Sequence, residues 1–101
     1  MQTNRFRTYD LAVTFYHKAS ELKLPYHLKD QLMRAASSVP LNLAEGSAKS
    51  SVKDRLRFYR IALASFREVQ AVLDLCRDSA LQDQSRILGA HLYKLCKALE
   101  H

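Results

Sequence analysis

Basic side chains crowd one stretch of the chain, between residues 49 and 67. Residues 49–60 contain five bases and a single acid, Asp54. A spacing of i, i+4, i+7 and i+14 would align four bases along one strip of a helix. These four are Lys53, Arg57, Arg60 and Arg67. Such a strip can hold phosphates by releasing their counterions, without sensing base sequence. The candidate nucleic-acid-binding residues are therefore Lys49, Lys53, Arg55, Arg57, Arg60 and Arg67.

The same pattern has a plainer interpretation, a solvated helix face that binds nothing, and both interpretations stay open here. Two observations favour a binding role. Phe58 and Tyr59 lie beside the strip and can stack on bases if they are exposed. Bases in the first turns of a helix oppose its dipole, so a role other than helix stability would account for them.

Residues that could support catalysis are sparse, and we predict that the chain is not an enzyme. Arg86 and His91 match the loose Arg-x4–6-His spacing of a helical ribonuclease family, which keeps a ribonuclease as the weaker alternative. With nine Arg and four His in the chain, chance alone supplies about one such match. The sequence has no Gly-rich phosphate loop, nucleophile elbow or paired-carboxylate site.

Metal ligands are equally sparse. His17 and His91 lack a second His or Cys at ligand spacing, so we expect no metal and no cofactor. Cys76 and Cys96 lie on apolar faces, and we expect both to be reduced thiols that behave as small hydrophobic residues.

Four helical segments would position these residues. The apolar spacing predicts helices over residues 8–23, 25–45, 51–78 and 84–98. Pro25 suits the first turn of the second segment, and Gly46 suits the position just past its end. Ser51, with Asp54 three residues on, is an N-cap candidate for the third segment, and Asp83 is one for the fourth. Short links between long helices favour antiparallel neighbours.

The second segment contains a proline without losing its helical phase. One apolar face continues on both sides of Pro40, through Leu28, Leu32, Ala35, Ala36, Val39 and Leu43. Pro40 cannot donate a hydrogen bond to the carbonyl of Ala36, and its ring crowds that turn, so we expect a kink. A mid-helix proline costs about 3 kcal/mol in an exposed helix, so packing must hold the bend. We predict an all-α, up-and-down antiparallel four-helix bundle with a proline-kinked second helix.

This segment also carries a family resemblance. Residues 34–46 read RAASSVPLNLAEG, close to a family pattern Arg-Arg-Ala-Ala-x-Ser-Ile-Pro-x-Asn-Ile-Ala-Glu-Gly in which Met33 replaces the first arginine. A second match covers residues 58–68, where Ala64 replaces a usual glycine. The chain thus resembles the small bacterial four-helix-bundle family encoded by intervening sequences in large-subunit rRNA genes, which includes the accessory variability determinant of diversity-generating retroelements. Its structural motif falls on Arg34, Pro40, Asn42, Glu45 and Gly46.

The resemblance, which covers residues 9–97, implies partners as well as a fold. Family members look like ring-forming homopentamers, and in the retroelement member a basic ring engages a reverse transcriptase and nucleic acid. We therefore expect a homo-oligomer, a pentamer by this resemblance. Nucleic acid and a reverse transcriptase or other protein are its candidate partners. The alternative is a scaffold that binds only protein.

Two further features concern contacts. Asn42 and Glu45 lie one helical turn apart and would either bind a partner or hydrogen-bond at the kink; the second is favoured because buried polar groups are paired. The first helix carries more apolar side chains than one inner face needs, which indicates a subunit contact or packing over the bundle end. These side chains are Phe6, Tyr9, Val13 and Tyr16.

Composition agrees with one small domain over residues 1–101, with residues 99–101 resembling the remnant of an affinity tag. Sixteen Lys and Arg against ten Asp and Glu give a net charge of +6. No apolar run of membrane-spanning length occurs, and the first ten residues lack the apolar core of a signal peptide. We therefore expect a cytoplasmic protein that does not enter the membrane.

Overall fold

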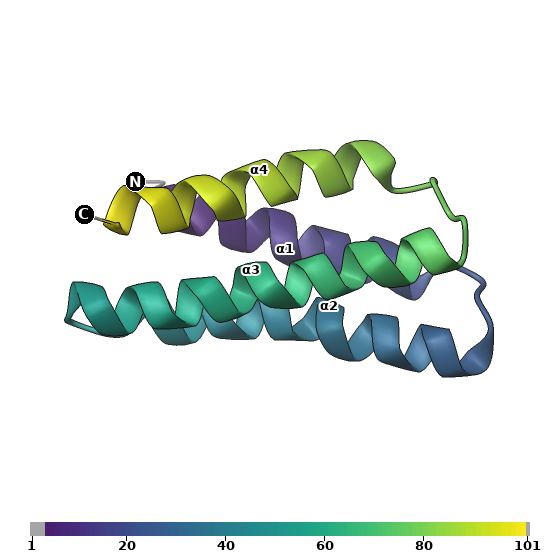
Figure 1. Cartoon of the computed structure of the whole chain (residues 1–101), viewed down its shortest axis with the longest axis horizontal. Coiled ribbons are helices and arrows are strands. Elements are labelled where there is room, and N and C mark those ends of the chain that lie inside the picture. Colours follow the sequence, from purple (N-terminus) through teal and green to yellow (C-terminus); the bar gives the residue numbers. More distant parts are fainter. Residues whose placement is uncertain (1–3, 101) are drawn as a thin grey trace.

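The computed structural model describes the backbone of residues 4–100 and the side chains of residues 7–100. Four helices account for most of this range, and residues 4–100 contain no strand (Figure 1). The predicted all-α four-helix fold is confirmed. The helices are α1 (Asn4–Ser20), α2 (Tyr26–Ser47), α3 (Val52–Leu75) and α4 (Gln82–Leu99).

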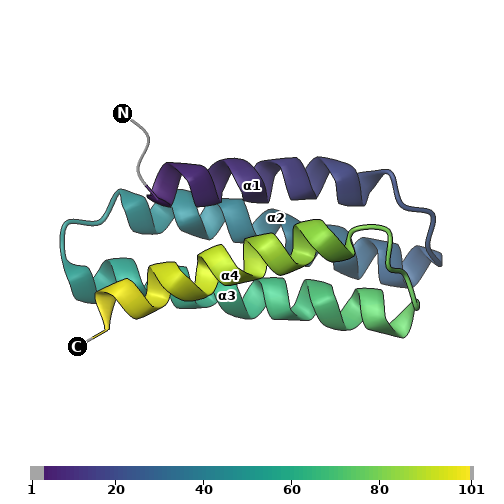
Figure 2. The ribbon, with the colours of Figure 1, turned by 90° about the horizontal axis from the view of Figure 1, so that it is seen from above.

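The helices form two layers of two. Followed by colour in Figure 1, each helix runs back along the one before it, so residues 4 and 100 lie at the same end of the bundle as the α2–α3 turn. Seen from above, α1 and α4 lie side by side and cover α2 and α3 (Figure 2). Contacts join α1 to α2, α2 to α3, α3 to α4 and α4 to α1, and the α2–α3 contact is the most extensive.

The core consists of the apolar faces that the helical spacing predicts. Phe15 of α1 packs edge-on against Phe66 of α3, with ring centroids 5.2 Å apart. This contact crosses the bundle between helices from opposite layers. The largest buried side chains also include Tyr59 of α3, Leu32 and Leu43 of α2, and Leu88 and Leu92 of α4. Burial of such a side chain contributes about 1.5–3 kcal/mol, so packing stabilises these helices more than their intrinsic propensity does.

Helix α2 continues through Pro40 from Tyr26 to Ser47. Val39 and Leu43, on either side of the proline, are both about 1% exposed. The apolar face therefore stays docked on both sides of the missing hydrogen bond, as the unbroken phase predicts. The bend at Pro40 itself stays a prediction.

The helix ends agree only in part with the sequence-based expectations. Ser51 is the N-cap of α3, where its hydroxyl accepts a hydrogen bond from the Asp54 amide at 3.1 Å. The prediction that Asp83 caps α4 is wrong, because the helix already begins at Gln82 and Asp83 lies inside its first turn. There its carboxylate faces the Arg86 guanidinium at 3.4 Å.

Helix α3 ends at Leu75, earlier than the predicted residue 78. The cause is Arg77, whose φ of 52° lies in the left-handed region. With this conformation the Asp78 amide donates to the Leu73 carbonyl and the Arg77 amide donates to the Asp74 carbonyl, both at 3.0 Å. These two bonds form a Schellman motif, which usually places glycine at the left-handed position.

Gly46 does not terminate α2, so that prediction is wrong. The helix runs on to Ser47, and Gly46 keeps an ordinary negative φ. Its role is contact with α3, because a β-carbon at this position would lie 2.8 Å from the Tyr59 ring and 3.0 Å from Phe58 Cβ. The absence of a side chain lets the two helices approach closely.

Two findings bear on environment. Within the described residues, no helix is long and apolar enough to cross a lipid bilayer. Both cysteines are free thiols; Cys96 is buried in the core and Cys76 is half-buried against it.

Candidate nucleic-acid interface

The two sequence motifs meet at the α2–α3 contact. The Ser38 hydroxyl of α2 lies 2.8 Å from the Ser65 hydroxyl of α3. Asn42 donates its side-chain amide to the Ser38 carbonyl at 2.8 Å and to the Ser38 hydroxyl at 3.0 Å. Asn42 therefore forms hydrogen bonds within α2, with Ser38 as its partner. These residues hold the helices together and present little to a ligand.

The charged residues of the motif, Arg34 and Glu45, form exposed ion pairs and take no part in the α2–α3 hydrogen bonds. Arg34 faces Asp30 at 3.9 Å, with 76% of its side chain exposed. Glu45 pairs with Lys49 at 3.2 Å and is 53% exposed. Exposed pairs of this kind contribute at most about 1 kcal/mol, so these two pairs add little to the stability of the bundle.

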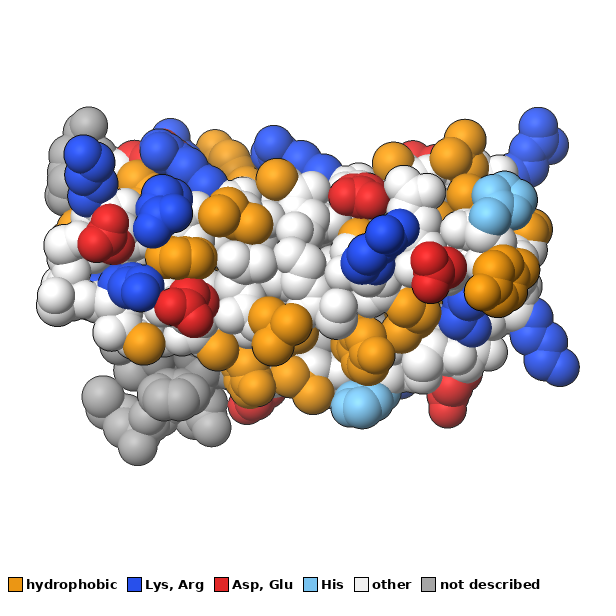
Figure 3. Space-filling view, turned by 90° about the horizontal axis from the view of Figure 1, so that it is seen from below, with side chains coloured by type: hydrophobic (Ala, Val, Ile, Leu, Met, Phe, Trp, Pro, Cys, Tyr) orange, Lys and Arg blue, Asp and Glu red, His pale blue; other side chains and the backbone are white. Residues whose placement is uncertain are grey.

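Charge is divided unequally between the two ends of the bundle. The end that holds the α2–α3 turn, the start of α1 and the end of α4 in Figure 1, hereafter the basic end, carries twice as many basic as acidic side chains among residues 7–100. In Figure 3 several blue side chains lie close together at this end, on the left, and others lie toward the right. Its bases are Arg7, Lys49, Lys53, Arg55, Arg57, Arg60, Lys94 and Lys97, and its acids are Asp10, Glu45, Asp54 and Glu100.

The predicted strip of bases is present along the solvent face of α3. Lys53, Arg57, Arg60 and Arg67 are all exposed. Arg60 contacts Glu100 at 3.2 Å, and this hydrogen bond lowers the pKa of the Glu100 carboxyl. Among the described residues, no carboxylate lies within ion-pair distance of Lys53, Arg57 or Arg67. These bases are available to phosphates.

The other two predicted site residues lie apart from the strip. Arg55 is half-buried and donates from Nη2 to the Lys49 carbonyl at 3.1 Å. Its Nε is buried and has no hydrogen-bond partner among the described residues. Arg55 therefore fastens the α2–α3 turn, while Lys49 pairs with Glu45.

Base stacking on Phe58 and Tyr59 required exposed rings, and the structure does not provide them. Tyr59 is 1% exposed, and its hydroxyl lies 3.0 Å from that of Ser47. Phe58 is half-buried, with the Arg57 guanidinium 4.5 Å and the Lys49 ammonium 5.3 Å from its ring centroid. The apolar phase of α3 already indicated burial of Tyr59, since it falls on one face with Ala62 and Phe66.

A groove that was not predicted from the sequence lies between α3 and α4. It has a volume of about 360 Å³. Tyr93, which is 52% exposed, forms part of its wall. The position of Tyr93 outside the apolar face of α4 could have indicated this exposure. The groove is lined by Arg60, Leu63, Ala64, Arg67, Tyr93, Cys96, Lys97 and Glu100.

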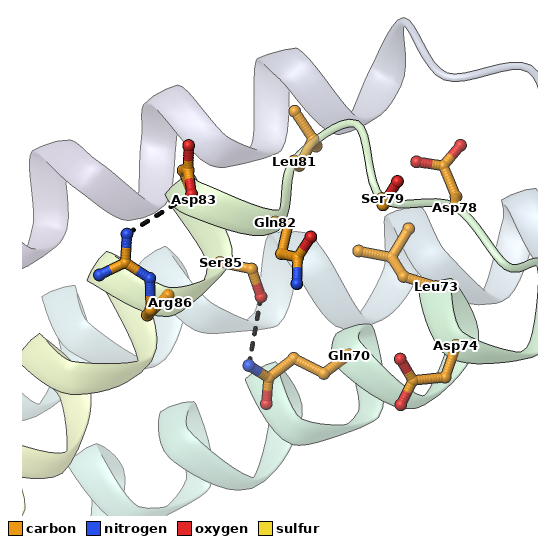
Figure 4. Close-up of a pocket in the computed structure, with 10 residues that line it drawn as sticks. All are labelled: Gln70, Leu73, Asp74, Asp78, Ser79, Leu81, Gln82, Asp83, Ser85 and Arg86. Carbon is orange, nitrogen blue, oxygen red and sulfur yellow. Dashed lines mark hydrogen bonds and ion pairs between the residues drawn. The ribbon is translucent and has the colours of Figure 1, made fainter.

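At the opposite end of α3 and α4, the charged side chains around a pocket are mostly acidic. A pocket of about 600 Å³ opens beside the α3–α4 turn, and Figure 4 shows its polar side chains. Gln70 donates to the Ser85 hydroxyl at 3.2 Å, and Arg86 pairs with Asp83. The pocket is also lined by Asp74 and Asp78. Because carboxylates outnumber bases in the lining, the pocket does not favour a polyanion.

The candidate ribonuclease pair is not assembled into one site. Arg86 and His91 are five residues apart on α4, which separates them by about 140° around the helix. Arg86 is exposed and pairs with Asp83, whereas His91 is half-buried. Burial lowers the pKa of His91, and the nearby charges of Arg7 and Lys94 lower it further. Within the described residues, no group of three or more His, Cys, Asp or Glu side chains could hold a metal ion.

The fold and this charge distribution define a small four-helix bundle with a basic end. A comparison with family models gave a match to the 23S rRNA-intervening sequence protein family over residues 6–101. The chain belongs to this family, which confirms the resemblance carried by the two motifs. No curated protein and no solved structure gave a match.

Proposed function

We propose that this protein is a cytoplasmic, non-enzymatic accessory module that binds the phosphate backbone of nucleic acid through the basic strip of α3. One observation carries the proposal most strongly. Three exposed cations, Lys53, Arg57 and Arg67, have no carboxylate within ion-pair distance among the described residues, and they follow one face of a helix. Helix stability does not favour bases near the helix start, whereas phosphate binding does.

Charge reversal at the basic end tests this proposal. The double variant Arg57→Glu with Arg60→Glu should bind RNA and DNA much more weakly than the wild-type protein. The matched control is Lys18→Glu with Lys23→Glu, which makes the same change in net charge near the end of α1 farthest from the strip. Equal losses in both variants would show that net charge alone, and not the strip, governs binding. Circular dichroism of each variant verifies that the helices persist.

The proposal includes self-assembly. Along α1, Tyr9 is 38% exposed, and Val13 and Tyr16 are half-buried. The adjacent helix α2 presents Leu41, which is 67% exposed. Hydrophobic side chains gather along the lower middle of the face in Figure 3. A second copy of the chain covering this face would account for them. The side chain of Phe6, also expected to take part, lies outside the described residues.

Light scattering tests the assembly. The proposal, guided by the family resemblance, is a homo-oligomer of five subunits. Leu41→Glu should reduce its mass by placing a charge in the contact, whereas Tyr26→Glu, at an exposed position at the start of α2, should not. A wild-type oligomer that binds neither RNA nor DNA would favour the alternative function, a scaffold for protein partners alone. A reverse transcriptase is one candidate partner, by the same resemblance.

A further inference from the structure

We infer that the groove between α3 and α4 is a subsite for one unpaired nucleotide, in which Tyr93 stacks on the base while Arg67 and Lys97 hold the flanking phosphates. This inference rests on the proposed function and deepens it. It specifies single-stranded nucleic acid as the preferred partner. It also assigns to Tyr93 the role of distinguishing an unpaired base from a paired one.

The groove has an apolar floor, an aromatic wall and a charged rim, which are the three surfaces that a nucleotide needs. Its floor includes Leu63, which packs against the core, and the buried Cys96. Burial raises the pKa of the Cys96 thiol, so the floor stays uncharged near neutral pH. The small side chain of Ala64 also lines the groove. The volume of about 360 Å³ falls within the range of about 300–1,000 Å³ typical of small-ligand sites.

Tyr93 and Ile87 are the two large hydrophobic side chains of α4 that are exposed, and Tyr93 is the more exposed of the two. Leu88, Leu92 and Leu95 are each at most 8% exposed, whereas Tyr93 is 52% exposed. Its half-exposed ring therefore stands in the groove wall and not in the core. An aromatic ring in such a position offers a stacking surface to any base, since every base has a π-face.

The rim of the groove supplies the charge. Arg60, Arg67 and Lys97 all line it. Glu100 neutralises part of this charge, because it contacts Arg60 at 3.2 Å and Lys97 at 3.5 Å. Arg67 has no carboxylate within ion-pair distance among residues 7–100 and belongs to the strip already described. The groove thus continues the phosphate-binding face of α3 onto α4.

The Tyr93 ring should contribute to the affinity for single-stranded nucleic acid but not to the affinity for a duplex. Bases inside a duplex are stacked on one another, so Tyr93 can reach only a base that is unpaired. A duplex would still contact the cations of the strip through its phosphates. Loss of the Tyr93 ring should therefore weaken single-strand binding and leave duplex binding unchanged.

The test measures fluorescence anisotropy with labelled oligo(dT) of about twelve nucleotides, within the range of about 4–16 that single-strand sites span. The same assay uses the duplex with oligo(dA), and an abasic strand of equal length that keeps the phosphates. The variants are Tyr93→Ala, Tyr93→Phe, which keeps the ring, and Tyr26→Ala, which removes an exposed ring at the opposite end of the bundle.

We expect Tyr93→Ala to bind oligo(dT) at least about fivefold more weakly than the wild-type protein. Its affinity for the duplex and for the abasic strand should equal the wild-type affinity, and Tyr93→Phe and Tyr26→Ala should retain full affinity for oligo(dT). Wild-type affinity of Tyr93→Ala for oligo(dT), or an equal loss on the abasic strand, would overturn the subsite. If Arg57→Glu with Arg60→Glu still weakens binding in that case, the proposed function stands and only the subsite fails. If the wild-type protein binds none of the three strands, both fail.

Discussion

The Ser38 hydroxyl of α2 lies 2.8 Å from the Ser65 hydroxyl of α3. This contact joins the two segments that carry the family resemblance, through two residues that are 27 positions apart along the chain. Because Asn42 also donates to Ser38, three polar side chains form one network at the most extensive helix contact of the bundle. The motif therefore specifies how α2 and α3 dock.

A double-mutant cycle measures this network. Ser38→Ala and Ser65→Ala should each lower the free energy of unfolding, and their coupling energy should be about 0.5–1.5 kcal/mol, the range for one hydrogen bond. Urea denaturation of the four proteins gives the value. A coupling energy near zero would mean that the two hydroxyls contribute independently, through packing alone.

Gly46→Ala should destabilise the bundle by about 1–3 kcal/mol, the usual cost of overpacking. The added β-carbon would lie 2.8 Å from the Tyr59 ring, and the ring is fully buried with little freedom to move. Gly89→Ala is the matched control in α4, because its β-carbon would meet Phe66 at an ordinary 3.5 Å. That variant should gain up to about 1 kcal/mol from helix propensity. Losses of similar size in both variants would refute the close approach at Gly46.

Arg77→Gly should raise the free energy of unfolding by about 0.5–1 kcal/mol. The left-handed conformation costs an L-residue about 1–2 kcal/mol, and the greater freedom of unfolded glycine removes part of the gain. Arg77→Val should lower stability, since a β-branched residue adopts a φ of 52° with difficulty. Thermal denaturation compares the three proteins, and a valine variant as stable as glycine would exclude strain at this turn.

Protonation of His91 should destabilise the fold. Burial, with Arg7 and Lys94 nearby, holds the folded-state pKa below the unfolded value of 6.5. Between those two pKa values the unfolded chain binds more protons, so the free energy of unfolding increases as pH rises through this window and is reduced below it. Denaturation at pH 5 and pH 7.5 measures the effect.

His91→Gln should remove this part of the pH dependence, and Arg7→Gln should reduce it, because Arg7 opposes the imidazolium charge. The comparison between variants isolates His91 from the carboxylates, which titrate at lower pH. An unchanged difference between the two pH values in His91→Gln would assign the pH dependence to other groups.

The sequence contains enough local information to predict four helices, their buried faces and the Ser51 cap. Periodicity and capping depend on residues a few positions apart, so they can be recognised without a fold. The same periodicity correctly carried α2 across Pro40. Arg77 is different, because nothing in the residue type signals a left-handed conformation at that position.

Two features that were not predicted correctly, the role of Gly46 and the groove, depend on partners distant in sequence. The role of Gly46 is determined by Tyr59 across the helix contact. Arg55 follows Lys53 by two residues, about 200° around α3, so helical spacing alone already places it off the strip. The groove around Tyr93 exists only once α3 and α4 are placed together. Spacing along a helix could identify the exposed strip of bases, but it could not show which neighbouring helix completes the surface.

A salt titration of wild-type binding to single-stranded nucleic acid tests phosphate binding by the α3 strip. If the four bases of the α3 strip each neutralise one phosphate, the logarithm of affinity should fall with the logarithm of salt concentration with a slope of about −3 per protomer. Arg57→Glu with Arg60→Glu should make this slope markedly shallower. An affinity that does not change between dilute and physiological salt would contradict phosphate binding by the strip.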